Sequence, residues 1–374
     1  MVEGIHLSLL MGPFVALPAP RNVVESLTGV QITSSSTGSS GFQLTFSVAK
    51  ESAINTTLIP AGYFDPKIRV VLVVTVNGLP NVLMDGIVTR QELSASNEPG
   101  KTTLTVTGED VSLLMGLDHR RIPMPALPDY AKINLALLPY LLNGVVPLVI
   151  PPIIDAIDSP TERWFTQNST DLAFIQQMAE ESGYVFYIDP GPLPNQSFAY
   201  FGPEIRIGIP QPALNVGMDG ESNVESLSFT YDGMAREQPT IVVLDPITHK
   251  VPIPIPIPDV SILKPPLAIK PATAFRTRPL SNVAKMSAAR ALLVGIAHSA
   301  NSADAITASG QLDVLRYGRV LKSRGLVGVR GAGLAYDGLY FVKSVTHTIK
   351  RGEYKQSFTL VRDGLISITP KVVP

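Results

Sequence analysis

The chain has 374 residues, which is enough for two or three folded domains. Its 30 Lys and Arg residues nearly balance its 31 Asp and Glu residues, so no overall field recruits nucleic acid or an anionic membrane. Cysteine is absent, which excludes a disulfide framework, a thiolate nucleophile and a sulfur-ligated metal. Only 16% of the residues are charged, so we expect other chains to cover much of the surface, with a low-charge monomer as the alternative.

Residues 29–110 are predicted to form a β region with the character of a small barrel or sandwich. Apolar and polar residues alternate through 42–48, which is typical of a half-buried strand. The nearly continuous Val and Leu run Arg69–Val76 indicates a strand buried on both faces. Asn77-Gly78 is a strong signal for a two-residue hairpin, and Val82–Val88 would be its returning strand.

The middle of the chain is predicted to contain an amphipathic helix over 170–183. Apolar residues recur every three or four positions through this segment, so they share one face of the helix. Thr170 or the residue before it can cap the helix start, and Asp171 places a negative charge near the positive helix end. Gly183 supplies the left-handed residue that ends the helix, and aromatic or β-branched residues at 184–188 predict a strand directly after it.

The segment 133–154 is uncharged and, at 22 residues, long enough to cross a bilayer. Four prolines and Asn143-Gly144 interrupt it, and a lipid-exposed helix broken at those points would leave carbonyl groups unpaired. We therefore predict a short buried helix near 131–142 followed by an extended segment, with no direct membrane insertion. A further strand is predicted at Glu204–Ile209.

From Asn223 the chain is predicted to be β again, through strands at 224–229 and 240–244. Every second residue from 252 to 258 is proline, which removes every second backbone donor and excludes a central strand. The Pro-rich arm (250–272) is therefore predicted to be polyproline-like, and it serves either as a linker or as an arm laid over a neighbouring subunit.

A second helix is predicted at 282–300, with Ser281 or Asn282 as its cap. An alternating strand over Ala303–Asp313 follows, and the chain closes on a hairpin over 339–362. Two β regions thus flank a mixed insert, which is an internally duplicated plan although the two regions have no visible sequence similarity. The predicted domains are a first β domain with an N-terminal extension, a mixed α/β insert and a second β domain, over 1–117, 118–220 and 221–374.

No catalytic or metal-binding pattern is recognisable, and we predict no catalytic residue, metal site or cofactor. Glycoside hydrolysis needs two facing carboxylates, but the pairs Asp155/Asp158 and Glu180/Glu181 are better explained as solvated charge. The glycine run 325–333 leads into strands rather than a helix, so it is predicted to form β-turns and not a phosphate loop. None of the five histidines has a second ligand at metal spacing: His6, His119, His249, His298 and His347.

One basic cluster lacks the interleaved aromatic residues of single-stranded nucleic-acid sites, so no specific nucleic acid is expected as a partner. The cluster is predicted to be a solvated rim, and the alternative is the lining of a channel that passes anionic cargo. Its residues are Arg316, Arg319, Lys322, Arg324 and Arg330.

Three sequence blocks stand in a fixed order along the chain. The first joins 42–46 to 83–88 and 104–110, the second covers 171–187, and the third covers 337–358. In this order they resemble the hub proteins of contractile phage tails and injection machines, namely the late-control D family and the N-terminal half of the valine-glycine-repeat spike proteins. The positions that carry the resemblance, expected to be structural, are Phe42, Phe46, Asp85, Gly86, Gly108, Asp110, Asp171, Leu172, Phe174, Ile175, Gly183, Tyr184, Tyr340, His347 and Tyr354.

The resemblance implies an α+β, mainly β fold with two tube-like antiparallel β-barrel domains in each chain. A homotrimer would then form a pseudo-hexameric ring that adapts the hexameric inner tube to a trimeric spike. The inner tube ring, the spike protein and other baseplate subunits are the implied partners. Because the sequence stops at Pro374, soon after the last hairpin, we expect the spike to be a separate polypeptide and no lysozyme domain to be present.

Two other functions stay open from the sequence. One is a tail-tip cell-wall hydrolase, which would need a carboxylate pair, and the other is a membrane-attached module that uses residues 133–154. The N-terminus does not resemble a signal peptide, because Glu3 precedes its apolar run and prolines break that run. The chain is therefore expected to be made in the cytoplasm and incorporated in a phage tail or a contractile injection particle, whether extracellular or cell-anchored.

Overall fold

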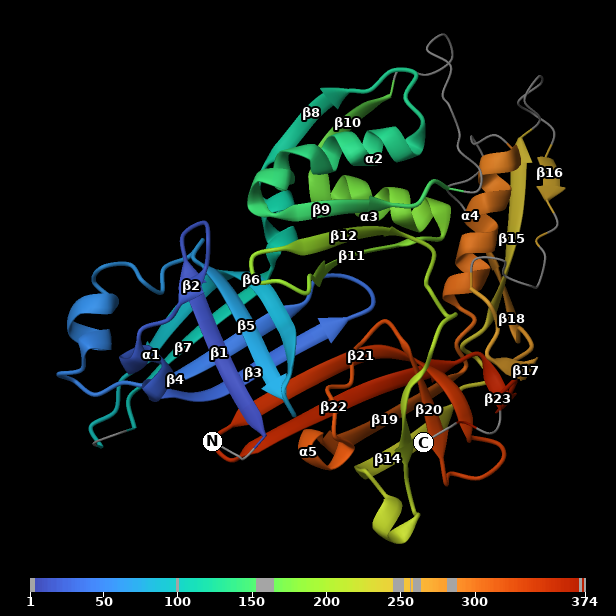
Figure 1. Ribbon diagram of the computed structural model, residues 1–374. Helices are drawn as coiled ribbons and strands as arrows, with labels where there is room; N and C mark the ends of the chain where they lie inside the picture. Colours follow the sequence, from blue (N-terminus) through green and yellow to red (C-terminus); the bar gives the residue numbers. More distant parts are fainter. Residues whose placement is uncertain are drawn as a thin grey trace.

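The computed structural model describes residues 4–98, 101–152, 165–244, 252–255, 257, 264–280, 288–369 and 372. Its main feature is a sheet to which both β regions contribute, with 13 strands among these residues. A mixed α/β insert packs on one side of this sheet, and it lies above the sheet in Figure 1. The expected α+β, mainly β fold class is confirmed.

The first β-half (residues 5–110) forms as its hydrophobic pattern predicts. Residues 69–76 are a strand with six of eight residues buried, and the hairpin turn has positive φ at Asn77 (50°) and Gly78 (81°). The returning strand is longer than predicted, and the strand at the N-terminus was not predicted. The elements are β1 Ile5–Gly12, β2 Leu17–Pro18, α1 Arg21–Ser26, β3 Leu27–Ser35, β4 Gly41–Ser47, the π-turn η1 Ile54–Leu58, β5 Arg69–Val76, β6 Leu79–Ser94 and β7 Thr103–Asp110.

The insert has its own apolar core between its helices and a small sheet. The predicted helix is confirmed: the Thr170 hydroxyl accepts a hydrogen bond from the Ala173 amide, and Gly183 ends the helix at φ 67°. The elements are η2 Val111–Gly116, β8 His119–Pro123, α2 Asp129–Leu137, η3 Leu138–Asn143, β9 Val145–Val149, β10 Thr166–Thr170, α3 Asp171–Ser182, β11 Val185–Pro190 and β12 Ser197–Gly202.

Where it is described, the apolar segment 133–154 forms a helical stretch followed by strand β9, as predicted. The helical stretch is only partly buried, however, since Leu138 and Leu142 are 57% and 94% exposed. Within the described residues, no helix has both the length and the apolar character needed to span a bilayer. The strand predicted at Glu204–Ile209 is wrong. The preceding strand is β12, and these residues follow it. The side chains of Glu204 and Arg206 belong to a cluster of ion pairs, and Ile209 is 97% exposed.

The second β-half comprises β13, β14 and β19–β23. Its closing hairpin is confirmed, with Gly352 at φ 84° in the turn. β13 lies within the range predicted for the insert but pairs with β20 of this half. The elements are β13 Gln211–Asn215, η4 Asp219–Glu221, β14 Val224–Tyr231, β19 Ile306–Asp313, α5 Val314–Tyr317, β20 Leu326–Arg330, β21 Gly338–Lys350, β22 Glu353–Arg362 and β23 Gly364–Ser367.

A flanking layer separates β14 from β19 in the chain. The Pro-rich arm was predicted to be polyproline-like, but within its described residues Pro252–Ile255 is strand β16, paired antiparallel with β15, and Ala268–Pro271 is strand β17. β16 is an edge strand, which suits proline because only one side of the backbone needs donors. The other elements are β15 Glu237–Leu244, β18 Arg276–Pro279 and α4 Ala288–Asn301; the predicted helix start and cap at 281–287 lie outside the described residues.

The two β-halves repeat one strand order. The first half runs β3-β4-β7-β6-β5-β1, and the second runs β14-β19-β22-β21-β20-β13. Neighbouring strands within both halves pair antiparallel, with one exception. β13 pairs parallel with β20, whereas its counterpart β1 pairs antiparallel with β5. The internal duplication that the sequence suggested only as a plan is therefore present in the topology.

Irregularities of the ladders repeat at matching places. A bulge interrupts the β6–β7 register at Thr89, and the matching bulge interrupts β21–β22 at Lys343. A second pair of bulges falls at Thr28 in β3–β4 and at Glu225 in β14–β19. Bulges fix register and bend a strand locally, so two shared bulges align the halves residue by residue.

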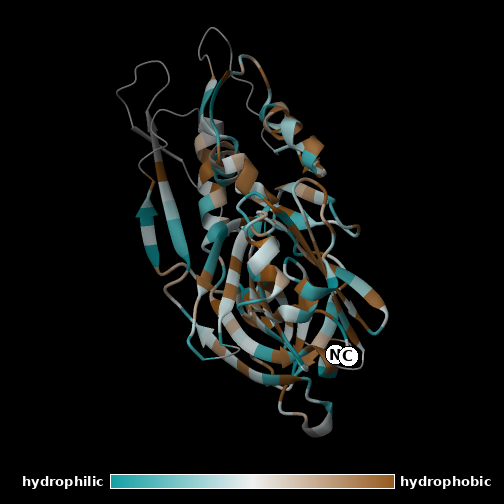
Figure 2. Cartoon of the chain, turned by 90° about the vertical axis from the view of Figure 1, so that its left-hand side faces the viewer, coloured by the Kyte–Doolittle hydropathy of each residue, from teal (hydrophilic) through white to brown (hydrophobic). Residues whose placement is uncertain are grey.

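The halves are joined edge to edge by antiparallel pairing of β3 with β21, from Gly29 opposite Lys350 to Ser35 opposite Ser344. Figure 1 shows these two strands side by side at the centre of the sheet. One apolar core runs through both halves, and brown and teal bands alternate along the strands in Figure 2. The two predicted β regions thus share a sheet and a core.

Candidate functional site

The β3–β21 joint is the first candidate site, because both halves and the insert meet there. Arg324 lies beside it at φ 65°, and its side chain is 6% exposed. Its guanidinium donates to the Ser35 carbonyl at 2.9 Å and to Asp189 of the insert at 2.6 Å. The same guanidinium stacks 4.0 Å from the centre of the Tyr187 ring. One side chain therefore ties three parts of the molecule together.

Lys67 is the counterpart of Arg324 in the first half. It also has a positive φ, 78°, and its amide donates to the Val88 carbonyl at 2.9 Å, as the amide of Arg324 donates to Val342 at 2.9 Å. The left-handed conformation is unfavourable for a residue with a Cβ, so its recurrence marks a constraint of the fold.

A buried ion pair connects the first half to the insert. Arg69 and Asp85 form a two-pronged contact at 2.7 and 2.6 Å, and the Ser197 hydroxyl of the insert donates to Asp85 at 3.0 Å. A buried carboxylate needs such partners, because unpaired charge is strongly disfavoured in the interior.

Two of the glycines singled out in the sequence make room for one aromatic ring. A Cβ built on Gly86 or on Gly108 would lie closer than 3.0 Å to the ring of Phe42 and to neighbouring backbone. Phe46, four residues further along β4, is fully buried and packs 5.3 Å from Phe64, ring centre to ring centre. These residues are packing positions of the first half.

Asp110 ends β7 and begins the next turn. Its carboxylate accepts hydrogen bonds from the amides of Ser40 at 2.5 Å and Ser112 at 3.0 Å, so it caps η2. Burial raises the pKa of Asp110, and these hydrogen bonds together with Arg324 act in the opposite direction.

Asp171 does more than the sequence predicted, because it is fully buried rather than exposed at the helix end. It accepts hydrogen bonds from Tyr140 and Gln167, both at 2.7 Å, and lies 3.0 Å from Arg120. The polar network therefore fixes α3 to the start of the insert. Residues Leu172, Phe174, Ile175 and Tyr184 belong to the insert core or its border.

The last group of positions lies in the closing hairpin. The Tyr340 hydroxyl donates to the Tyr336 carbonyl at 2.8 Å, under the guanidinium of Arg362. His347 Nδ1 lies 2.8 Å from the Tyr354 hydroxyl, and burial lowers the pKa of this histidine to about 4. His347 is thus a buried neutral residue of the β3–β21 joint.

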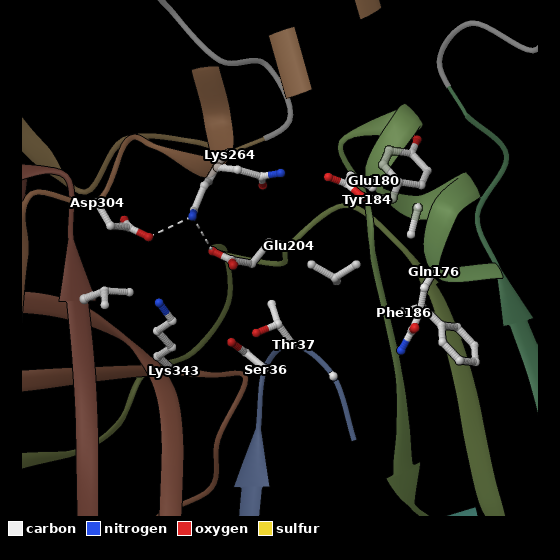
Figure 3. A pocket seen from close by; sticks show the side chains of 15 residues that line it. Ser36, Thr37, Gln176, Glu180, Tyr184, Phe186, Glu204, Lys264, Asp304 and Lys343 are labelled. Atoms are coloured by element: carbon white, nitrogen blue, oxygen red, sulfur yellow. Dashed lines mark hydrogen bonds and ion pairs between the residues drawn. The ribbon is translucent and has the colours of Figure 1, made fainter. Parts of the chain in front are cut away.

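A cavity of about 360 Å³ lies between α3, the end of β3 and the second half (Figure 3). Lys264 bridges the carboxylates of Asp304 at 2.7 Å and Glu204 at 3.5 Å on its wall. Arg206, behind them and 1% exposed, contacts the same two carboxylates at 2.7 and 2.5 Å. Three carboxylates line this cavity, those of Glu180, Glu204 and Asp304.

The ion pairs of this cluster favour the ionised forms of Asp304 and Arg206. Burial alone would raise the pKa of Asp304, but Arg206 and Lys264 outweigh it and lower that pKa to about 2. The neighbouring carboxylates likewise raise the pKa of Arg206 against the effect of burial. A glycosidase acid needs a raised pKa to donate its proton, so the lowered pKa of Asp304 does not suit that role.

Other sequence candidates do not converge. Over the described residues, no group of three or more His, Asp or Glu side chains could hold a metal ion. His249, Asp155 and Asp158 lie outside the described residues. The basic cluster is divided: Arg316, Arg319 and Lys322 are exposed, whereas Arg324 is taken into the joint and does not belong to a rim.

Comparison with known proteins supports the fold. No family model matches the chain, and no curated protein does. Solved structures match over nearly the whole length. A tail protein from Neisseria meningitidis has a TM-score of 0.63 at 13% identity, covering 97% of this chain and 98% of its own. The 43 kDa tail protein of prophage MuSo2 from Shewanella oneidensis has a TM-score of 0.63 at 14% identity, covering 96% and 99%.

The protein therefore has the fold of phage tail proteins. More particularly, the same fold occurs in an Escherichia coli component of the type VI secretion system that is itself similar to tail proteins of bacteriophage T4. That match has a TM-score of 0.55 at 12% identity and covers 93% of this chain and 77% of the other. The resemblance noted in the sequence thus extends to the three-dimensional structure.

Proposed function

We propose that this chain is a structural hub subunit of a contractile injection machine, in a phage tail or a related particle. Three copies form a ring that connects a hexameric inner tube to a trimeric spike, with other baseplate subunits around it. The chain acts by matching symmetries and carrying load, and its charge clusters are not needed for bond chemistry in this role.

The duplicated β-half is the observation that carries this proposal. One chain presents two units with the same strand order and two shared bulges, joined side by side through β3 and β21. Three such chains present six similar units, which is the number that a sixfold neighbour requires. A spike with three subunits can contact the same ring with one spike subunit for each hub chain.

The exposed apolar residues favour burial against partner chains. Large side chains stand in solvent on several parts of the described surface, and Leu142 and Ile209 are 94% and 97% exposed. Scattered apolar residues are normal, but a chain with only 16% charged residues has little polar surface to offset them. Others in this group are Phe14, Ile207, Phe275 and Leu334.

The mass of the purified particle tests the proposal. Native mass spectrometry should give three times the 40.1 kDa chain mass, and electron microscopy should show a ring with six similar lobes. Addition of tube and spike proteins from the same source should yield complexes on opposite faces. A ring that released fragments from cell-wall peptidoglycan would instead favour the hydrolase alternative, and detergent dependence would favour the membrane module.

A further inference from the structure

The pseudo-repeat gives the chain two equivalent pairs of strand edges, and the joint between the two halves uses only one of them. β3 and its counterpart β14 are the first strands of the repeated order, and β21 and its counterpart β6 are the long bulged strands. β3 pairs with β21 within the chain. In the described part of the chain, β14 pairs only with β19, and the end of β6 beyond its bulge pairs only with β7.

We infer that β14 of one copy pairs antiparallel with residues 89–94 of β6 in a second copy, repeating the β3–β21 joint between chains. This inference rests on the proposed function, because it names the surfaces through which copies of the hub would join. It is a head-to-tail contact between two different surfaces, which closes into a ring when the rotation allows.

The edge of β6 has the same backbone hydrogen-bonding pattern next to its bulge as the edge of β21. At β21, the amide of Arg324 and the carbonyl of Gly325 hydrogen-bond with the backbone of Val342. Beyond the bulge, β21 pairs with β3 instead. At β6, Lys67 and Ile68 fill the ladder next to Val88 with amide–carbonyl distances of 2.9 and 2.8 Å. Beyond Val88 the side chains on this edge are exposed or half-exposed, and a strand can be added.

The shared bulges fix the register of the inter-copy joint. In the observed joint Gln31 lies opposite Thr348, Ile32 opposite His347 and Ser35 opposite Ser344. Transfer through the matching bulges places Ser228 opposite Ser94, Phe229 opposite Leu93 and Asp232 opposite Arg90.

These pairs are chemically complementary. Leu93 is 47% exposed and would be covered by Phe229. Leu93 and Phe229 would form an apolar pair at the position that the buried pair Ile32 and His347 has in the observed joint. Asp232 would lie opposite Arg90, with Lys67 at the place from which Arg324 reaches the end of β3. Opposite charges directly across a ladder favour pairing, and a one-residue slip would lose both matches.

Disulfide trapping tests the joint directly, since the natural chain has no cysteine. The double variant Ser228→Cys/Ser94→Cys should form chains linked between copies on mild oxidation. The yield should exceed that of the out-of-register variant Ser228→Cys/Arg90→Cys by at least about tenfold, because a disulfide needs Cα atoms within roughly 7 Å. The variant Thr33→Cys/Thr346→Cys is the matched positive control, since these hydroxyls are 3.1 Å apart and would link within one chain.

Charge exchange supplies a second readout that does not depend on oxidation. Arg90→Asp and Asp232→Arg should each weaken self-association by about tenfold, and the double exchange should restore most of it, because each single change sets like charges opposite each other. Unfolding temperatures of the separated chains should be the same for the single variants and the parent, since both side chains are exposed in the single chain.

The outcomes separate the joint from the proposed function. Three copies with the 94–228 link support both. Three copies without the link, beside an efficient 33–346 control, overturn the joint and leave the hub standing. The link in open chains or in rings of another size supports the joint and overturns the threefold hub. A chain that stays single at every concentration overturns the joint.

Discussion

The two β-halves fill matching layers of their core with side chains from different strands. In the first half the large ring of Phe42 on β4 packs over Gly86 and Gly108 on β6 and β7. At the matching positions the second half has Ala308, Tyr340 and Leu360, all buried, so the large side chains stand on the opposite strands. A core is specified by total volume and pattern more than by the residue at each position.

The next layer shows the same exchange with a smaller change of volume. Leu44 faces Val106 across β4 and β7, whereas Gly310 faces Phe358 across β19 and β22. A Cβ on Gly310 would meet the Phe358 ring, which explains the glycine. The comparison therefore teaches that the fold repeats its backbone, with its bulges, and not its side chains.

Aspartate placed in the matching core position of either half should give the largest effect. Phe46→Asp and Leu312→Asp each bury a carboxylate in the one apolar core that runs through both halves. Each should lower the free energy of unfolding by more than about 5 kcal/mol and remove ring assembly, because a buried unpaired charge is strongly disfavoured. Soluble yield and thermal unfolding measure this. A half that still unfolded cooperatively beside a collapsed partner would show that the cores are independent.

Loss of the Arg69–Asp85 ion pair should give the next largest change in the free energy of unfolding. The second half shows which residues can replace this pair. The matching positions there hold Leu326 and Leu339. Arg69→Leu alone should cost about 3–5 kcal/mol by leaving Asp85 buried and unpaired, and Arg69→Leu/Asp85→Leu should recover most of that loss. Denaturant unfolding of the single and double variants measures the coupling. Equal losses in both variants would mean that the Ser197 hydrogen bond to Asp85, not the ion pair, dominates.

The sequence predicted strands correctly where alternating apolar and polar residues, or a continuous apolar run, ended at a strong turn signal. Arg69–Val76 with Asn77-Gly78 is the clearest case, and Thr170 to Gly183 is its helical counterpart, since cap, face and end agree. The strand expected at Glu204–Ile209 failed because its alternating isoleucines face solvent, while Glu204 and Arg206 are held by distant Asp304 and Lys264.

The candidate site could not be predicted in the same way. The β3–β21 joint pairs residues about 300 positions apart, and no local pattern encodes which edges meet. Arg324 was assigned to a basic rim because four other cations surround it in sequence, although its partners Asp189 and Ser35 come from the insert and the first half. The exchange of large and small residues between strands also hides the duplication from any position-by-position comparison.

The pH dependence of stability should separate the two halves, because His347 stands where the first half has Leu93. The pKa of buried His347 is lowered from 6.5 to about 4, so its neutral form favours folding. This contribution is complete above pH 6.5 and is lost as the pH falls toward 4, about 3 kcal/mol in all. His347→Gln should therefore show a flatter stability curve over that range by denaturant unfolding at several pH values. Parallel curves for parent and variant would contradict this account.

The smallest effect should have opposite signs in the two halves. Lys67 and Arg324 both hold a left-handed backbone, at φ 78° and 65°, where glycine has no Cβ penalty. Lys67→Gly in the free chain should therefore raise stability, by up to about 1 kcal/mol. Arg324→Gly gains the same relief but loses the contacts with Ser35, Asp189 and the Tyr187 ring, so stability should fall. Thermal unfolding of the separated chains measures both. In assembled rings, Lys67→Gly should also become destabilising, because in the inferred joint Lys67 has the position of Arg324.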